Sequence, residues 1–138
     1  TNSPISVDET LVTLQDMRRI THEGIAEIAG IKINRVGGLT KARRLRDMAL
    51  AHGMQIYVMA TGGSVMADTE ASALALSIPE EMRLGGWACQ DMLTVDIAPG
   101  KGMRSQDGYH YALSEPGLGF APDEALLGNA VAVYEADS

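Results

Sequence analysis

The sequence has one cysteine, one tryptophan and one phenylalanine among its 138 residues. Because Cys89 has no second cysteine in this chain, an intrachain disulfide framework is excluded and a reducing compartment is favoured. No apolar run approaches the length of a membrane-spanning helix, and no charged segment followed by an apolar one resembles a signal peptide. These absences predict a cytoplasmic protein that does not bind a membrane.

Positive charge is also scarce. The chain has 11 Lys and Arg against 18 Asp and Glu, which gives a formal net charge of -7. Affinity for phosphates comes from clustered Lys and Arg, so we expect no nucleic-acid partner. The basic residues cluster only in "KARRLR", Lys41 to Arg46, within a helical pattern. The solvated face of a helix is favoured there over a binding patch.

Short strand patterns alternate with helical ones along the first ninety residues. With 46% hydrophobic and 21% charged residues, the chain is able to form one domain with a real core. Regular alternation of strands and helices indicates an α/β fold with a parallel sheet and right-handed crossovers. We expect Thr10 to cap the first helix. The expected strands are 4–7, 31–34, 55–60 and 85–89, and the expected helices are 8–24, 40–53 and 64–78.

The last third of the chain has a different composition. Residues 99–138 are dense in Gly and Pro, and only "YHYAL" reads as a strand. We therefore divide the chain into 1–98, which holds the alternating units, and 99–138, a loop-rich segment with a hairpin that packs over the sheet. The opening "TNSPISVDET" reaches a strand almost at once, so we expect this sequence to begin within a domain.

In parallel α/β folds, functional side chains gather where strands end. Each candidate there also has a plain structural reading: an acid can favour a helix start, a lysine can lie at a sheet edge, glycines can form tight turns, and a lone cysteine can be a small buried hydrophobe. Asp8 and Glu9 follow the first expected strand, and Thr61 to Ser64 follow the third. Lys32 lies at the second, with Asn34 and Arg35 beyond it, and the fourth ends in Cys89, Gln90 and Asp91.

Together these strand ends favour a chemical site over separate structural roles. A carboxylate, a lysine and a glycine-rich turn suit a site that binds a carboxylate substrate through a hard divalent cation. The lysine would take a proton from the carbon next to that carboxylate, while the cation stabilises the enediolate. We expect burial and nearby cations to lower the lysine pKa for this task. The three histidines lack His-x-x-x-His spacing and receive no role.

The motifs carry a family resemblance. "SVDET" after a strand, K-x-x-x-x-G-G in "KINRVGG", and "PGLG" in the tail resemble the last four βα units of the enolase superfamily, in its mandelate racemase and muconate-lactonizing branch. The resemblance implies strands five to eight of a modified TIM barrel, with the tail returning to a capping domain. "YVMATGGSVMADTEAS" and "GGWACQDMLTVD" look most like the cis-3-hydroxy-L-proline dehydratase and proline-racemase-like members.

The resemblance also implies roles for individual residues. Asp8 matches a ligand of Mg²⁺ or another divalent cation such as Mn²⁺, and Lys32 matches the acid–base lysine. The mandelate racemase pattern has a histidine in the loop after the seventh strand, and this chain has none there. The residues implied to contact substrate are Thr61, Gly62, Gly63, Ser64, and Gln90 or Asp91.

The implied reaction is dehydration of a hydroxyproline-type imino acid. Open alternatives are a racemase or epimerase of proline derivatives or dipeptides, and a muconate cycloisomerase. A non-catalytic assembly module is an alternative of another class, and a phosphate-binding α/β domain is disfavoured because G-x-x-x-x-G-K-[ST] and G-x-G-x-x-G are absent. The family's second base and two further metal carboxylates lie in the first half of the barrel, so the resemblance implies a second chain or segment as partner. It also implies a homo-oligomer of the full enzyme.

Overall fold

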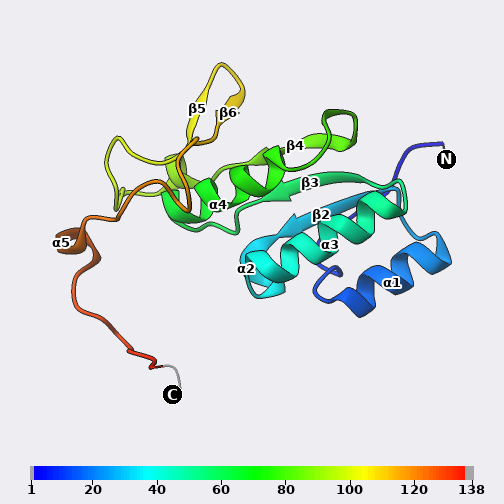
Figure 1. Ribbon diagram of the computed structural model, residues 1–138, viewed down its shortest axis with the longest axis horizontal. Coiled ribbons are helices and arrows are strands. Elements are labelled where there is room, and N and C mark those ends of the chain that lie inside the picture. The colour runs from blue at the N-terminus through cyan, green and yellow to red at the C-terminus, as the bar shows by residue number, and fades with distance from the viewer. Residues whose placement is uncertain (1, 136–138) are drawn as a thin grey trace.

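The computed structural model describes residues 2–135 and contains one parallel sheet in the strand order β1-β2-β3-β4 (Figure 1). The prediction of an α/β fold with a parallel sheet is confirmed. The strands are β1 Ser6–Val7, β2 Ile28–Lys32, β3 Gln55–Met59 and β4 Arg83–Trp87. The connecting helices are α1 Leu14–Glu23, α2 Ile33–Val36, α3 Leu39–Ala51 and α4 Val65–Leu76, and the short 3₁₀ turns η1 Glu80–Met82 and η2 Gln90–Met92 flank β4.

The first helix begins later than the sequence indicates. Thr10 does not cap it, so that prediction was wrong. Thr13 is the N-cap instead: its hydroxyl accepts a hydrogen bond from the Asp16 amide, and Asp16 bonds back to the Thr13 amide. This reciprocal capping box satisfies two backbone donors at once. Thr10 cannot form such a box, because the residue three positions later is Thr13 and not an acid. Gly24 ends the helix in the left-handed conformation, as expected.

Strand β2 differs from its expected position in a way that bears on Lys32. The strand begins at Ile28 rather than Ile31, and it ends at Lys32 because Ile33 already belongs to α2. Gly30 permits this pairing, since a Cβ there would lie 2.9 Å from the Val7 carbonyl oxygen. The strand is thus a buried parallel one with small residues at its centre. Similarly, β4 ends at Trp87, so Cys89 lies beyond the strand.

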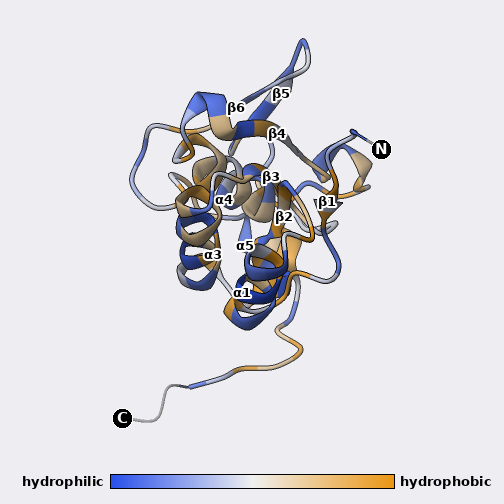
Figure 2. Ribbon diagram, turned by 90° about the vertical axis from the view of Figure 1, so that its right-hand side faces the viewer, coloured by the Kyte–Doolittle hydropathy of each residue, from blue (hydrophilic) through white to orange (hydrophobic). Residues whose placement is uncertain are grey.

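The core lies on one face of the sheet, beneath the helices. Its strand residues are Val7, Ala29, Ile31, Ile56 and Val58, all 8% exposed or less. Because side chains alternate along a strand, Lys32 projects to the opposite face. In Figure 2 the hydrophilic colour marks much of α1 and α3, whereas α4 is largely apolar. An apolar surface all round is expected of a helix that is covered on more than one side.

The tail forms the expected hairpin. Strands β5 Arg104–Gln106 and β6 Tyr109–Tyr111 pair antiparallel, and the turn Asp107-Gly108 has positive φ at both residues, as tight hairpin turns require. His110 Nε2 lies 3.2 Å from the Gly86 carbonyl oxygen, so the hairpin contacts β4. A short helix, α5 Glu124–Leu127, follows. Domain boundaries at residue 98 stay a prediction.

Within residues 2–135 the sheet is open, because β1 pairs only with β2 and β4 only with β3. Two large apolar side chains of β4 are exposed, Leu84 at 46% and Trp87 at 55%. A groove of about 420 Å³ runs between α4, β4 and the hairpin. None of the helices in this part of the chain combines the length and apolar character that crossing a membrane requires.

Candidate active site

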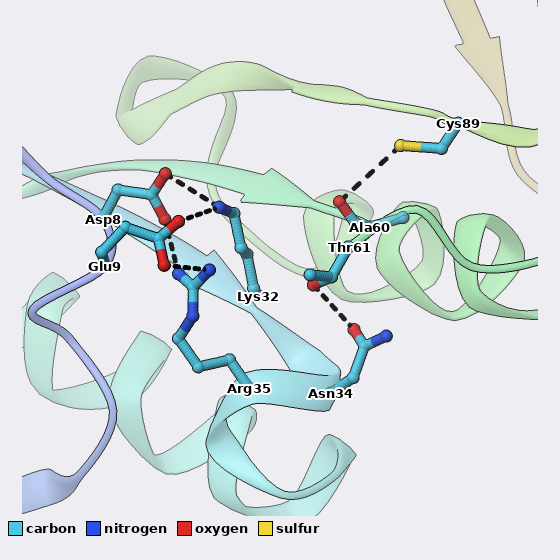
Figure 3. A network of polar contacts seen from close by, with 8 residues as sticks. All are labelled: Asp8, Glu9, Lys32, Asn34, Arg35, Ala60, Thr61 and Cys89. Atoms are coloured by element: carbon cyan, nitrogen blue, oxygen red, sulfur yellow. Dashed lines mark hydrogen bonds and ion pairs between the residues drawn. The ribbon is translucent and has the colours of Figure 1, made fainter. Parts of the chain in front are cut away.

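Four charged side chains meet at the carboxyl ends of β1 and β2 (Figure 3). Lys32 Nζ lies 2.9 Å from Asp8 Oδ2 and 2.7 Å from Glu9 Oε1. The Arg35 guanidinium bridges the same two carboxylates, 2.7 Å from Asp8 Oδ1 and 2.6 Å from Glu9 Oε2. We call Asp8, Glu9, Lys32 and Arg35 the charged cluster. It confirms that the first two expected strand ends come together.

The local sequence explains how these side chains meet. Val7 pairs with Ala29, so Asp8 lies beside Gly30, whose missing side chain leaves room for it. Lys32 projects from the same face two residues further along β2. Arg35 follows in α2, one turn beyond the strand end. The two cationic side chains are 12% and 15% exposed, whereas those of Asp8 and Glu9 are 38% and 71% exposed, so the cluster opens toward solvent on its acidic side.

The electrostatics of Lys32 contradict one expectation. The hydrogen bond to Glu9 raises the pKa of Lys32, and this effect together with Asp8 outweighs burial and the Arg35 charge, which lower it. The predicted lowering of the Lys32 pKa was therefore wrong for this arrangement, because two carboxylates stabilise the ammonium form. Burial raises the pKa of Asp8, but the hydrogen bonds from Lys32 and Arg35 lower it by more. The Lys32 hydrogen bond also lowers the pKa of Glu9.

Residues 2–135 do not provide a complete donor set for a cation. Among residues 2–135, no group of three or more His, Cys, Asp or Glu side chains is placed to hold a metal ion. Asp8 and Glu9 do supply carboxylate oxygens, which are the donors that Mg²⁺ and Mn²⁺ prefer. The chemistry of these two residues fits a metal site, which would need further ligands from outside residues 2–135. The role of Asp8 as a ligand stays a prediction.

The loop after β3 lies next to the end of β2. Thr61 Oγ1 donates a hydrogen bond of 3.1 Å to Asn34 Oδ1, so Thr61 is near the strand end that carries Lys32. Ser64 instead caps α4, because its Oγ accepts the Met66 amide at 3.3 Å. Gly62 adopts positive φ. A Cβ at Gly63 would come 2.5 Å from the Ala67 Cβ, so this turn requires glycine for close packing.

The two residues predicted after β4 have different environments. The Gln90 side chain is directed into the protein, where its Nε2 donates 3.1 Å to the Met103 carbonyl oxygen. Asp91 is exposed. No hydrogen bond or ion pair within residues 2–135 joins Asp91 to the charged cluster. Within this part of the chain, the structure therefore brings together Asp8 and Lys32, and separately Thr61 and Asn34.

Sequence reasoning missed two residues of this region. Trp87 is the register partner of Met59, which is the partner of Lys32, so the three form a row on one face of the sheet. The strand pattern alone did not show which face Trp87 takes. Asp68, fully buried on α4, was also missed; the available signal was an acid within an otherwise apolar helix.

Comparison with known proteins identifies the family of this chain. Residues 1–126 match the family model described as Enolase C-terminal domain-like. The cis-3-hydroxy-L-proline dehydratase of Roseibium aggregatum is 34% identical over 95% of this chain and 35% of its own length. The chain thus spans about a third of the length of the curated relatives it matches.

Solved structures show the same fold. A mandelate racemase/muconate lactonizing enzyme-like protein from Silicibacter pomeroyi superposes with a TM-score of 0.92 at 58% identity, over 98% of this chain and 37% of that one. An enolase superfamily member from Roseovarius nubinhibens, solved in complex with magnesium, superposes with a TM-score of 0.93 at 42% identity, over 99% of this chain and 37% of that one. The prediction that the fold is the C-terminal half of this barrel is confirmed.

Proposed function

The chain belongs to the Enolase C-terminal domain-like family, and from that membership we propose that it supplies half of the active site of a metal-dependent enzyme that removes the proton next to a substrate carboxylate. The proposed reaction is dehydration of a hydroxyproline-type imino acid, as in the name of the Roseibium aggregatum relative. The observation that carries the proposal is the contact of 2.9 Å between Lys32 Nζ and Asp8 Oδ2 at the ends of adjacent parallel strands.

Lys32 is the proposed catalytic residue. Its ammonium group lies at the edge of the sheet, on the face that the helices leave uncovered. It is protonated in this arrangement because Asp8 and Glu9 raise its pKa. Accepting a proton therefore requires that these carboxylates be engaged by another cation, which removes the stabilisation of the ammonium form. In the proposed dehydration, the proton that Lys32 takes from the α-carbon is then donated to the departing hydroxide, which leaves as water, and the amine of Lys32 is neutral again.

Asp8 is the proposed ligand for Mg²⁺ or Mn²⁺. Mg²⁺ in proteins is often held by one or two carboxylates and keeps several waters, which fits the open acidic side of the charged cluster. When bound, the cation would neutralise charge that develops on the substrate carboxylate. The remaining ligands would come from a segment outside this sequence.

Two of the proposed substrate-contacting residues, Thr61 and Asp91, follow β3 and β4 at the carboxyl edge of the sheet. Thr61 offers its hydroxyl beside Asn34, and Asp91 offers an exposed carboxylate beyond β4. Gln90 holds the tail by its side chain rather than facing the edge. Once Lys32 has taken the α-proton, hydroxide leaves from the β-carbon, and the enamine that results tautomerises to an imine, so the substrate loses one water. The proposed substrate-contacting set is completed by Gly62, Gly63 and Ser64 of the loop before α4.

The proposed partner is a second segment or chain that carries the first half of the barrel and the capping domain. Three observations support it: β1 and β4 each have one unpaired edge within residues 2–135, Leu84 and Trp87 are exposed, and the relatives are about three times as long as this chain. An open, apolar edge of this kind needs a cover. A homo-oligomer of the full enzyme and a cytoplasmic location, the latter from the unpaired Cys89, belong to the same proposal.

The test is turnover by the complete enzyme that contains this chain. With Mg²⁺ and cis-3-hydroxy-L-proline we expect an imine product, and we expect EDTA to abolish it. Exchange of the α-proton without elimination would favour the racemase or epimerase alternative. If no small imino or amino acid loses its α-proton, the catalytic proposal is wrong and the assembly-module alternative stands.

A further inference from the structure

A ring of hydrogen bonds joins α4, the loop after β4 and the tail. Asp68 lies on α4 with no exposed surface. Its Oδ2 accepts the backbone N–H groups of Cys89 at 2.9 Å and Gln90 at 2.7 Å, and its Oδ1 accepts Cys89 again at 3.1 Å. The buried carboxylate thus accepts hydrogen bonds from two consecutive amides, and Asp91 is the next residue in the chain.

The ring closes through the tail. Gln90 Nε2 donates 3.1 Å to the Met103 carbonyl oxygen, and the Met103 amide donates 3.0 Å to Thr69 Oγ1. Thr69 follows Asp68 on α4, and its hydroxyl also donates 2.7 Å to the Val65 carbonyl oxygen. Each of the three segments is therefore bonded to the other two.

The tail approaches α4 closely enough to require glycine. Gly102 has positive φ, and a Cβ there would clash with the Val65 Cγ2 and lie 3.0 Å from Thr69 Oγ1. Close backbone approach of this kind fixes Met103, which is 1% exposed. The acceptor that holds the Gln90 side chain is therefore itself held in place.

Asp68 is not the N-cap of its own helix. Ser64 caps α4, because its Oγ accepts the Met66 amide. Burying a carboxylate is unfavourable unless it is well hydrogen-bonded, and burial raises the Asp68 pKa while the Gln90 and Cys89 amides oppose that rise. Within residues 2–135, the Asp68 carboxylate accepts hydrogen bonds only from the loop after β4, which indicates that the position of this loop matters.

We propose that Asp68 is a positioning residue that holds Asp91 at the carboxyl edge of the sheet through the amides of Cys89 and Gln90. The inference rests on the proposed function, because it assigns Asp91 to the substrate side of that site. Asp68 itself does not touch the substrate. The orientation of Asp91 depends on the amides of Cys89 and Gln90, which Asp68 of α4 holds in place. The tail holds the Gln90 side chain through the Met103 carbonyl oxygen.

The test compares Asp68→Asn, Asp91→Asn and the double variant in the complete enzyme. Asn keeps the shape of Asp68 but turns a donor toward one of the two amides. We expect Asp68→Asn to raise KM about tenfold with a smaller change in kcat, a size typical of coupled neighbouring residues. We expect no further loss when Asp68→Asn is added to Asp91→Asn. Glu70→Gln, two residues along α4, is the control and should leave KM unchanged.

Two outcomes overturn the proposal: an unchanged KM in Asp68→Asn where Asp91→Asn raises it, or additive effects in the double variant. If Asp68→Asn does not fold, Thr69→Val breaks the ring from the tail side while keeping side-chain volume. It should raise KM several-fold only where Asp91 is present. A wild-type enzyme that exchanges no α-proton would instead remove the proposed function, so the two failures are distinct.

Discussion

The contact between Lys32 and Asp8 depends on the identity of a few individual residues. Strand β2 ends at Lys32, and Gly30 leaves room for Asp8 beside it. The apolar pattern predicted that Asp8 follows the first strand and that Lys32 lies in the second, but not that the second strand ends at Lys32. It could not predict the Lys32 pKa, since that depends on where Glu9 and Arg35 place their charges in space.

Replacing Asp8 tests its assignment as a metal ligand. We expect Asp8→Asn in the complete enzyme to weaken Mg²⁺ binding by about tenfold or more, because a neutral amide is a poorer donor for a hard cation. Asp47→Asn is the matched control, since Asp47 pairs with Arg46 on α3, outside the charged cluster. Calorimetric titration with Mg²⁺ measures the difference. Equal Mg²⁺ affinity in Asp8→Asn and Asp47→Asn would refute the assignment.

The burial of Asp68 leads us to expect a distinct pH dependence of the unfolding free energy. Burial raises its folded pKa above the ordinary value of 3.8, so its stabilising contribution is present below that value and is lost as pH rises through the folded pKa. The unfolding free energy of the wild type relative to Asp68→Asn should therefore fall as pH rises from 3.8 upward. Urea unfolding of both proteins across this range measures the difference.

Asp16 provides the opposite case. Its hydrogen bonds with Thr13 lower its pKa, so its contribution is present above the ordinary carboxyl pKa and is lost as pH falls through the folded pKa. The wild type relative to Asp16→Asn should lose stability toward acid. For each variant, the quantity to compare is how its difference in unfolding free energy from the wild type changes with pH. The same direction of change for Asp68→Asn and Asp16→Asn would show that burial does not set the titration of Asp68.

Among the elements, α1 shows the limit of reading caps from sequence. Thr10 and Thr13 both precede the apolar positions of this helix, and a threonine is an acceptable cap at either. Only the return bond from Asp16 separates them, and it depends on a spacing of three residues that the "T-x-x-D" pattern contains. By contrast, the end at Gly24 follows directly from its backbone freedom.

Matched substitutions test this cap. Thr13→Ala should lower the unfolding free energy by about 1 kcal/mol, because the Asp16 amide loses its acceptor. Thr10→Ala should change it by only a few tenths of that amount. Denaturant unfolding of the complete enzyme gives both values. If Thr10→Ala proved the more damaging of the two, the helix would begin where the sequence alone suggested.

For the whole molecule, regular βα alternation was enough to predict the parallel sheet, and the motif "KINRVGG" was enough to indicate the barrel family. The buried ring around Asp68 was not predictable, because Cys89 and Met103 are brought to α4 by tertiary packing alone. Nor did any local pattern show that Gln90 faces inward while Asp91 faces out.

The open sheet leads us to expect that this chain assembles with another segment of the enzyme. Within residues 2–135, β1 and β4 each keep an unpaired edge, and Trp87 is 55% exposed. We expect this chain to be recovered together with the first half of the barrel, on one polypeptide or two. Native mass spectrometry measures this directly. A monodisperse species of 14.7 kDa that is fully folded without a partner would contradict the expectation.

The central claim is that Lys32 moves the α-proton of the substrate. The most direct measurement is deuterium uptake at the α-carbon of proline and hydroxyproline derivatives, with the complete enzyme and Mg²⁺ in D₂O, compared between wild type, Lys32→Ala and the exposed-lysine control Lys41→Ala. The account predicts exchange in the wild type and in Lys41→Ala, and a loss of at least about a hundredfold in Lys32→Ala. Exchange that persists unchanged in Lys32→Ala would contradict it.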